Sequence, residues 1–349
     1  MSSLPKTYKA WVVEKAGGPM VLKDLELKQP GPNQVLVRVR ACGVCHSDTG
    51  MSSGAFGDVF PRVPGHELVG DVVAVGEGVT RFSGGERVGG PWHGGHDLAC
   101  RQCQRGQFQM CDHAAINGVT QDGGYAEYAL RGQFQMCDHA AINGVTQDGG
   151  YAEYALLRSE AVVRIPKELD VAEVAPLLCA GVTVFNSIRK MQIEQGNLVA
   201  VQGVGGLGHL AVQYAVKMGY KVVVLSSGSA KEDFARKLGA HEYIDSSKDD
   251  PVKKLQELGG AALIPAGKLC ILAPVGGLEI NSIDLIVGGR SVWGWPAGHA
   301  LDSEEAIAFA STHNVKCMIE KFPMSQAKEA TDHMLQNKVR FRSVLMIDE

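Results

Sequence analysis

Residues 41–48 of the chain read Ala-Cys-Gly-Val-Cys-His-Ser-Asp, and residues 64–67 read Pro-Gly-His-Glu. The two stretches bring thiols, imidazoles and carboxylates into a short part of the sequence. Zinc binds these three kinds of side chain, and a zinc ion with an open coordination position is a Lewis acid. The sequence therefore indicates a catalytic metal site around which the fold is built.

Length and composition limit the class of protein. A chain of 349 residues is long enough for about two domains with cores of their own. The net charge of −4 gives no reason to expect nucleic acid or an acidic membrane as a partner. The N-terminal residues lack the apolar segment of a secretory signal, and no uncharged apolar run is long enough to span a membrane. We therefore expect a cytoplasmic protein with neither a membrane nor a nucleic-acid partner.

The nine cysteines suggest metal ligation rather than disulfides. Their odd number, the long chain and the missing export signal argue against a disulfide framework. Cys42 and Cys45 also have the spacing of a redox pair, but such pairs open a helix after a strand in a thioredoxin-like context that is absent here. Cys270 and Cys317 lie in apolar or helical surroundings and are expected to be packing residues.

Two sequence patterns predict two kinds of domain. Residues 8–40 alternate apolar and polar side chains, which is typical of antiparallel strands, and residues 68–76 predict another strand. Residues 197–202 read as a buried parallel strand, followed by Gly-Val-Gly-Gly-Leu-Gly at 203–208 and a helix. Such a strand, glycine-rich turn and helix form the fingerprint of a dinucleotide-binding fold.

Together these motifs resemble the zinc-dependent medium-chain alcohol dehydrogenases, fungal and yeast-like members included. The resemblance covers most of the chain and rests on GVCHSD, PGHE, the clustered cysteines and GVGGLG. It implies an α/β protein in which a GroES-like, β-rich catalytic domain is joined to a doubly wound Rossmann cofactor domain. The expected division is 1–168 for the catalytic domain, 169–300 for the cofactor domain, and 301–349 for a return to the first domain.

The resemblance also implies the ligands of a catalytic Zn²⁺, which are Cys45, His66 and Cys179. Glu67 would enter the coordination sphere when water or product leaves, and Asp48 would hydrogen-bond the outer nitrogen of His66. Each residue has a plainer interpretation, because Cys179 lies among leucines and alanines and GHE could be an ordinary turn. Their joint occurrence favours the zinc site.

A second zinc site, with a structural role, is expected where cysteines cluster. Close spacing suits a tetrahedral site, and the family pattern of four cysteines is matched here except at its first place. The expected ligands are Asp97, Cys100, Cys103 and Cys111. His96 competes for the fourth position, and an unmetallated loop remains the alternative.

The resemblance implies roles for residues around the catalytic zinc. Ser47 would take the substrate proton and pass it outward through the cofactor ribose. Many relatives end this relay at a histidine, where this chain has Gly50, so proton release would go through water or His46; His46 could equally bind the cofactor pyrophosphate. Trp92 and His93 would line the substrate pocket, and Trp92 would narrow it towards small primary alcohols or aldehydes.

The cofactor is expected to be NAD(P), with NADP preferred. The strand at 221–225 ends at Ser226, where NAD-binding proteins usually carry an acidic residue for the ribose 2′-hydroxyl. Ser226 and Lys231 suit a 2′-phosphate instead. Arg342 would contact the pyrophosphate by resemblance, or be a solvated charge on an edge strand. The full set of expected cofactor-binding residues is Gly203, Gly205, Gly206, Leu207, Gly208, Thr183, Ser226, Lys231 and Arg342.

The chain departs from the family in two places. Residues 131–156 repeat residues 105–130 letter for letter, and we expect one surplus copy between 112 and 150 to form a surface loop, because closing a longer loop costs little additional entropy. One strand–helix unit is missing before Lys268, which would leave unpaired strand edges and exposed apolar faces in the cofactor domain.

The expected function is therefore an alcohol dehydrogenase that acts on a small alcohol or aldehyde. The alternatives are a zinc-binding family member without activity and a polyol dehydrogenase. A homo-oligomer, either a dimer or a tetramer, is expected.

Overall fold

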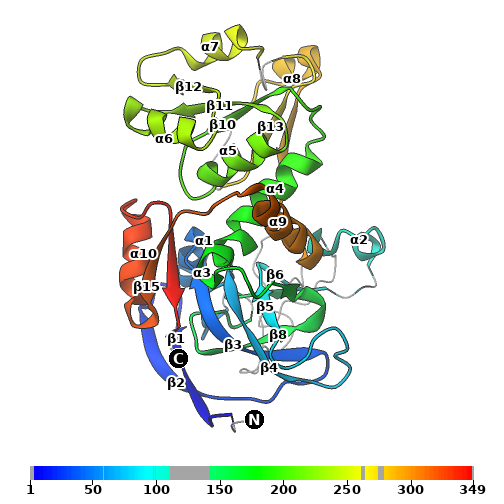
Figure 1. Cartoon of the computed structure of the whole chain (residues 1–349), viewed down its shortest axis with the longest axis vertical. Coiled ribbons are helices and arrows are strands. Elements are labelled where there is room, and N and C mark those ends of the chain that lie inside the picture. The colour runs from blue at the N-terminus through cyan, green and yellow to red at the C-terminus, as the bar shows by residue number, and fades with distance from the viewer. Residues whose placement is uncertain are drawn as a thin grey trace. The chain divides into compact units, whose positions relative to one another are not determined.

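The computed structural model describes residues 4–57, 59–96, 98, 100–110, 141–145, 147–260, 264–273 and 279–347 (Figure 1). The chain divides into two compact units. Unit 1 contains Met1–Cys179, Gly298–Ile307 and Cys317–Glu349, and unit 2 contains Ala180–Ala297 and Ala308–Lys316. Cys179 is therefore the last residue of the first segment of unit 1.

Unit 1 is built on a seven-stranded sheet. Its order is β15 (Ile319–Pro323), β16 (Arg342–Met346), β3 (Gln34–Gly43), β4 (Leu68–Val75), β5 (Arg87–Gly90) and β9 (Val163–Arg164), and β8 (Tyr154–Arg158) also pairs with β3. Alternate residues of β3 face a buried core, in which Val35, Val37 and Val39 are at most 1% exposed. The chain end returns to this sheet, because β16, drawn in red, pairs with the end of β3 (Figure 1).

Shorter elements complete unit 1. The hairpin-like pair β1 and β2 is antiparallel, and β6 pairs with β7. The helix α10 contacts β16. The bounds of these elements are β1 (Thr7–Val13), β2 (Met20–Glu26), β6 (His93–Gly95), β7 (Ala141–Ile142), α1 (His46–Ser52), α2 (Arg101–Gln104), η1 (Phe108–Met110), η2 (Ser159–Ala161), α3 (Val171–Val174), η3 (Ala175–Leu178), η6 (Met324–Gln326) and α10 (Ala327–Leu335).

The duplicated segment contributes to unit 1 from both copies. Residues 105–110 belong to the first copy and residues 141–156 to the second, whereas 111–140 lie outside the described residues. The expected surface loop falls largely in that range and stays a prediction. The two strands that follow Tyr151 have different partners, since β8 pairs with β3 and β9 pairs with β5.

Unit 2 contains a parallel sheet of the expected kind. Its strands β10 (Leu198–Gln202), β11 (Lys221–Ser226) and β12 (Glu242–Asp245) lie in the order β10-β11-β12. Val222, Val223 and Val224 are each 0% exposed, so β11 is covered on both faces, as parallel strands are. The helices are α4 (Ala180–Lys190), α5 (Gly208–Lys217), η4 (Ser229–Lys231), α6 (Glu232–Lys237) and α7 (Pro251–Glu257), and α9 (Ala300–His313) is shared by both units.

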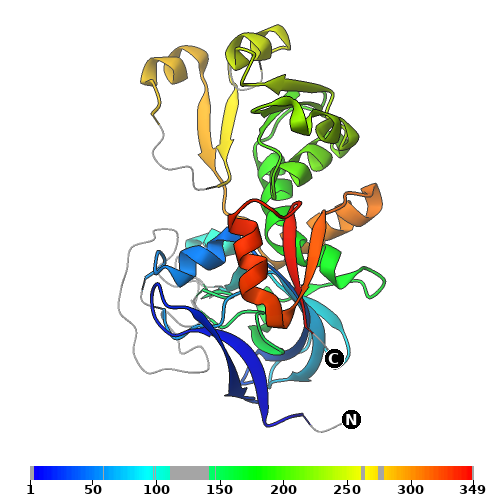
Figure 2. The same cartoon turned by 90° about the vertical axis from the view of Figure 1, so that its left-hand side faces the viewer.

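The later strands of unit 2 form a sheet of their own. Strands β13 (Lys268–Ile271) and β14 (Ser291–Gly294) form a separate two-stranded parallel sheet, and no described strand joins it to β10 (Figure 2). The helix between them, α8 (Ser282–Gly288), has Ile286 and Val287 exposed by 78% and 81%. The described strands thus form two separate sheets, and the missing strand–helix unit as the cause stays a prediction.

In the described part of the chain, no single helix is both long and apolar enough to cross a membrane. Two consecutive helices, Val171–Leu178 and Ala180–Lys190, meet that criterion only when they are taken together across a bend.

Candidate active site

Four side chains of unit 1 converge on one point. The ligand atoms of Cys45, His66, Glu67 and Cys179 all lie within 4.8 Å of one another. Cys45 precedes α1, the histidine and the glutamate precede β4, and Cys179 follows η3. Among the described residues, no other group of three or more such side chains could hold a metal ion. The structure thus brings together the three expected zinc ligands and the neighbouring glutamate.

Glycine is required where the strand before Cys45 approaches the turn before β4. Gly43 N–H donates to the Glu67 carbonyl at 3.1 Å. A Cβ atom at Gly43 would lie 1.9 Å from Glu67 Oε2, so any larger residue would displace this carboxylate. Gly65 has φ of +101°, a backbone conformation that residues other than glycine rarely adopt. Both glycines therefore fix the turn that carries His66.

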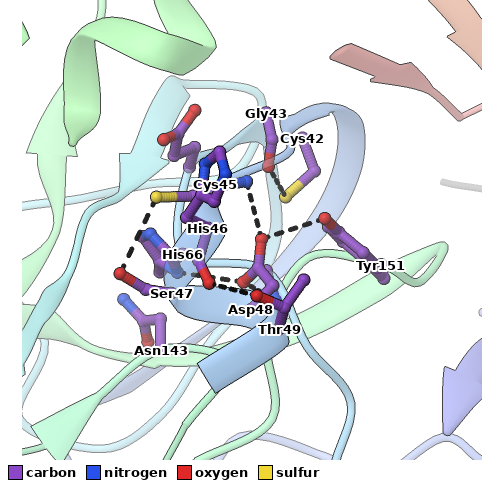
Figure 3. Close-up of polar contacts among 12 residues, drawn as sticks. Cys42, Gly43, Cys45, His46, Ser47, Asp48, Thr49, His66, Asn143 and Tyr151 are labelled. Carbon is purple, nitrogen blue, oxygen red and sulfur yellow. Dashed lines mark hydrogen bonds and ion pairs between the residues drawn. The ribbon is translucent and has the colours of Figure 1, made fainter. Parts of the chain in front are cut away.

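Asp48 connects several parts of the site (Figure 3). Its Oδ2 accepts hydrogen bonds from Cys45 N–H at 2.8 Å and from the Tyr151 hydroxyl at 3.0 Å, and its Oδ1 accepts from Gly65 N–H at 3.2 Å. His66 Nδ1 lies 3.1 Å from Asp48 Oδ1 in an ion-pair contact, and the hydrogen bond expected there stays a prediction. Asp48 is thus placed to orient the imidazole, as expected. The contact from Tyr151 was not expected.

The pKa values of the two cysteines of the group are shifted in opposite directions. A hydrogen bond with Cys179, together with the charges of His66 and Arg342, holds the Cys45 pKa well below its usual value despite burial. The hydrogen bond with Cys45, followed by burial, raises the pKa of Cys179. Burial alone would lower the pKa of His66, but the charges of Asp48 and Cys45 raise it above its ordinary value. These pKa directions favour a Cys45 thiolate beside a His66 imidazolium when no metal is bound.

Glu67 is paired with Arg342 in the interior. The guanidinium Nη2 contacts Glu67 Oε1, and the two side chains are 5% and 0% exposed. Burial raises the pKa of Glu67 to about 7, although Arg342 acts in the opposite direction. The alternative of a solvated edge-strand charge at Arg342 is wrong, because β16 lies between β15 and β3. Its expected contact with the cofactor pyrophosphate stays a prediction.

The donor set fits zinc. His66 Nε2 and Glu67 Oε2 are buried and have no hydrogen-bond partner among the described residues. Leaving such atoms unpaired in the interior is costly, and a metal ion would satisfy both. Two cysteine sulfurs and one histidine nitrogen are a known ligand set of catalytic zinc sites, which leave one position open.

The residues expected to surround the metal differ in how far their side chains are exposed to solvent. Ser47 Oγ lies 3.8 Å from Cys45 Sγ, whereas His46 is exposed. The ring of Trp92 meets the His66 ring edge-on with centroids 4.8 Å apart. His93 is 3% exposed and stacks against His96, so its side chain points into the protein interior.

The second expected metal site is described only in part. Cys100 and Cys103 are both buried, and Cys103 N–H donates to Cys100 Sγ at 3.4 Å. Asp97 and Cys111 lie outside the described residues. His96 stacks on Phe108 with ring centroids 4.3 Å apart and forms no metal-binding group with the two described cysteines.

The expected cofactor residues of unit 2 form the predicted turn. Gly203 follows β10 with φ of +85°, and a Cβ atom on Gly208 would lie 1.9 Å from the Gly203 carbonyl oxygen. Gly205, Gly206 and Leu207 complete the turn before α5. Lys231 Nζ donates to the Val204 carbonyl at 3.2 Å, so this ammonium lies beside the turn. Thr183 is buried within α4.

Ser226 ends β11 beside an acidic residue of the next strand. It is paired in register with Asp245 of β12. Asp245 Oδ1 accepts from Gly228 N–H at 2.7 Å and from Ser247 Oγ at 2.6 Å. This carboxylate therefore holds the loop after Ser226 in place.

Comparisons with known proteins agree on one family. Residues 31–131 match the description "Alcohol dehydrogenase GroES-like domain", and residues 206–266 match "Zinc-binding dehydrogenase". The chain is 48% identical to the alcohol dehydrogenase patD of Penicillium expansum, with 99% of each sequence covered, and 34% identical to an alcohol dehydrogenase of Geobacillus stearothermophilus, covering 97% and 100%. A cinnamyl alcohol dehydrogenase structure from Sorghum bicolor has 30% identity and a TM-score of 0.81, with 98% of both chains covered.

Proposed function

Because this chain belongs to the zinc-dependent medium-chain alcohol dehydrogenases, we propose that Cys45, His66 and Cys179 hold its catalytic zinc. The protein is an oxidoreductase that interconverts an alcohol with an aldehyde or ketone, using zinc and NAD(P). The observation that supports the ligand assignment is the convergence of these three side chains and Glu67 within 4.8 Å.

Each residue of the site has a proposed part in the reaction. A zinc ion held by Cys45, His66 and Cys179 would supply a Lewis acid for the substrate oxygen, and NAD(P) would supply the hydride chemistry. Ser47, beside Cys45, accepts the hydroxyl proton of the alcohol and returns it in the reverse direction. His46 is exposed, so it can pass that proton to water. Asp48 keeps His66 in the tautomer that leaves the other ring nitrogen free for the metal.

Glu67 and Arg342 set the charge beneath the metal. Two thiolates would balance the charge of Zn²⁺, so the Glu67 carboxylate would leave the site negative, and the buried Arg342 guanidinium compensates that charge. Oε1 of Glu67 is engaged by Arg342, whereas Oε2 has no described partner. We propose that Oε2 is the oxygen that Glu67 would offer to the zinc as an additional ligand.

We propose small primary alcohols and the matching aldehydes as substrates. Trp92 packs against His66 and also against Phe56, with ring centroids 5.9 Å apart. The Trp92 and Phe56 rings belong to an apolar cluster with Met51, Val59 and Val145. An apolar wall leaves the additional hydroxyls of a polyol without partners, which disfavours a sorbitol-type substrate. Comparing ethanol, an aromatic alcohol and sorbitol tests this assignment.

We propose NADP as the preferred cofactor. Ser226 stands where a carboxylate would repel the 2′-phosphate, and Lys231 provides a positive charge beside the glycine-rich turn. Asp245, the carboxylate opposite Ser226, accepts hydrogen bonds from Gly228 N–H and Ser247 Oγ at Oδ1, and Lys248 Nζ lies 3.5 Å from its Oδ2. The ratio of the Michaelis constants for NADP and NAD tests the preference, and a strong preference for NAD would contradict it.

The remaining parts of the proposal concern the second metal and the assembly. We propose a structural zinc held by Asp97, Cys100, Cys103 and Cys111, a homo-oligomer of two or four chains, and a cytoplasmic location. Metal content distinguishes one bound ion per chain from two.

Metal analysis tests the catalytic site directly. The change is Cys179→Ala, and the matched control is Cys317→Ala, a cysteine that is 6% exposed and outside the group. We expect Cys179→Ala to lose one zinc per chain and all activity, and the control to keep both. After cobalt replacement, the thiolate absorption should weaken in Cys179→Ala alone. Full zinc content in Cys179→Ala would refute the assignment.

A further inference from the structure

Tyr151 holds the carboxylate that orients His66, and it comes from the second of two identical segments. Its hydroxyl donates to Asp48 Oδ2 at 3.0 Å, and the tyrosine side chain is 0% exposed (Figure 3). The first copy carries the same residue at Tyr125, which lies outside the described residues. We infer that Tyr151, and not Tyr125, is a positioning residue of the metal site that acts on His66 through Asp48.

Backbone hydrogen bonds attach the second copy to the turn that carries His66. Gly149 N–H donates to the Val63 carbonyl at 2.8 Å, and Tyr151 N–H donates to the Pro64 carbonyl at 3.1 Å. Between them, Gly150 N–H donates to the Gly65 carbonyl at 3.0 Å. The approach is so close that a Cβ atom on Gly149 would lie 2.0 Å from the Gly65 oxygen. This segment is therefore a fixed wall of the site.

The residue after the repeat decides which copy fits this place. Strand β8 begins inside the second copy and continues without interruption to Leu157, which pairs with Val35 of β3 and is 2% exposed. After the first copy, the corresponding position is Arg131. If the first copy formed β8 instead, Arg131 would take the buried position of Leu157. Burying an arginine there without a charged partner is energetically costly.

A further contact depends on the same continuity. Arg158, the next residue of β8, donates from Nη2 to the His96 carbonyl at 2.8 Å, and it forms an ion pair with Glu160. The first copy has Gly132 at this position and can make neither contact. The two copies are identical within the repeat, so the difference between them arises from the residues on its C-terminal side.

The hydroxyl of Tyr151 has a defined effect on Asp48. Cys45 N–H and Tyr151 both bond Oδ2, which prevents the carboxylate from turning and keeps Oδ1 beside His66 Nδ1. Outer partners of a metal-binding histidine commonly change metal affinity by about 10–100-fold when they are removed. This inference rests on the proposed zinc site, because Tyr151 acts through a ligand of that metal.

The test compares Tyr151→Phe with Tyr125→Phe in the full chain. The readouts are the rate at which zinc passes to a chelator and the thermal unfolding midpoint of the zinc-free protein. We expect Tyr151→Phe to release zinc about 10-fold faster or more, and Tyr125→Phe to behave like the unchanged protein.

A double-mutant cycle with Asp48→Asn separates positioning from packing. If Tyr151 acts through Asp48, then Tyr151→Phe adds little to zinc release in the Asp48→Asn background. A packing role alone would lower the midpoint of the zinc-free protein equally in both backgrounds and leave zinc release unchanged. Equal zinc release from the two phenylalanine variants, or an undiminished effect in the Asp48→Asn background, would overturn the inference. If the unchanged protein binds no zinc through Cys45, His66 and Cys179, both the proposed function and this inference fail.

Discussion

Arg342 and Glu67 are 275 positions apart in the sequence and form an ion pair in the interior of unit 1. Strand β16 brings the arginine beside the end of β3, where Cys42 pairs in register with Leu345. The pair therefore connects the C-terminal strand to the turn that carries His66, the histidine proposed to bind zinc.

Removing Arg342 should destabilise the protein strongly. We expect Arg342→Met to lose about 3–5 kcal/mol of unfolding free energy, because it leaves the Glu67 carboxylate buried without its partner. Urea unfolding measures the loss, and Arg340→Met, two residues away and exposed, is the control that should change little. Adding Glu67→Gln should recover part of the stability. An Arg342→Met protein as stable as the control would show that this contact contributes nothing.

A carboxylate at position 226 should change the cofactor preference. Ser226→Asp places a negative charge at the end of β11, where it would repel a 2′-phosphate and accept a hydrogen bond from a ribose hydroxyl. We expect kcat/KM for NADP relative to NAD to fall about 10–100-fold, equivalent to about 1.4–2.8 kcal/mol. Ser83→Asp adds the same charge to an exposed position of unit 1 and should leave the ratio unchanged. If Ser226→Asp leaves the ratio of kcat/KM for NADP to that for NAD unchanged, the 2′-position of the bound cofactor does not lie beside residue 226.

The sequence predicted the features that depend on neighbouring residues. Cys45, Ser47 and Asp48 lie within one short stretch, so their chemistry indicated the metal site before any fold was known. The turn at 203–208 was predicted for the same reason, since a strand, a turn with four glycines and a helix are consecutive. That a missing segment interrupts the sheet of unit 2 stays a prediction.

Contacts between distant strands could not be predicted in this way. The partner of Glu67 depends on which strand lies beside β3, and nothing near Arg342 in the sequence indicates that strand. Tyr151 was hidden for a different reason, because an identical tyrosine occurs in each copy of the repeat. Only the pairing of β8 with β3 distinguishes the two.

The pH dependence of stability should include a contribution from Asp71. Partial burial would raise its pKa, but hydrogen bonds from Arg87 at 2.7 Å and Arg40 at 2.9 Å hold it below the usual value of 3.8. A carboxylate with a lower pKa in the folded state stabilises the protein above pH 3.8, and this contribution disappears as the pH falls through the folded value.

Asp71→Asn tests this sign. Because the carboxylate is only partly buried and solvent still screens its ion pairs, we expect the variant to be less stable by only about 1 kcal/mol at pH 7. The difference should stay constant down to the ordinary pKa of aspartate and shrink below it. Urea unfolding of the two zinc-free proteins across this range gives the measurement, with zinc removed so that ligand protonation does not contribute. A difference that grows towards acid would contradict the assigned pKa direction.

The separate sheet of unit 2 should open before the rest of that unit. Strands β13 and β14 pair only with each other among the described strands, and an isolated two-stranded sheet is marginally stable. Leu269 and Trp293 on these strands are 40% and 37% exposed, whereas Val222 to Val224 of β11 are fully buried. Segments held by few buried contacts unfold locally at a lower free-energy cost, so their amides exchange faster. In native-state hydrogen exchange, we therefore expect the amides of β13 and β14 to exchange at least about 100-fold faster than those of β11, a difference of about 2.7 kcal/mol.

The amides of β3 in unit 1 are the internal control for slow exchange. Protection of β13 and β14 equal to that of β11 would mean that another surface, such as a second chain of the proposed oligomer, covers the interrupted sheet in solution. Repeating the exchange at several protein concentrations would separate these cases, because cover from a second chain weakens on dilution and cover from within the chain does not.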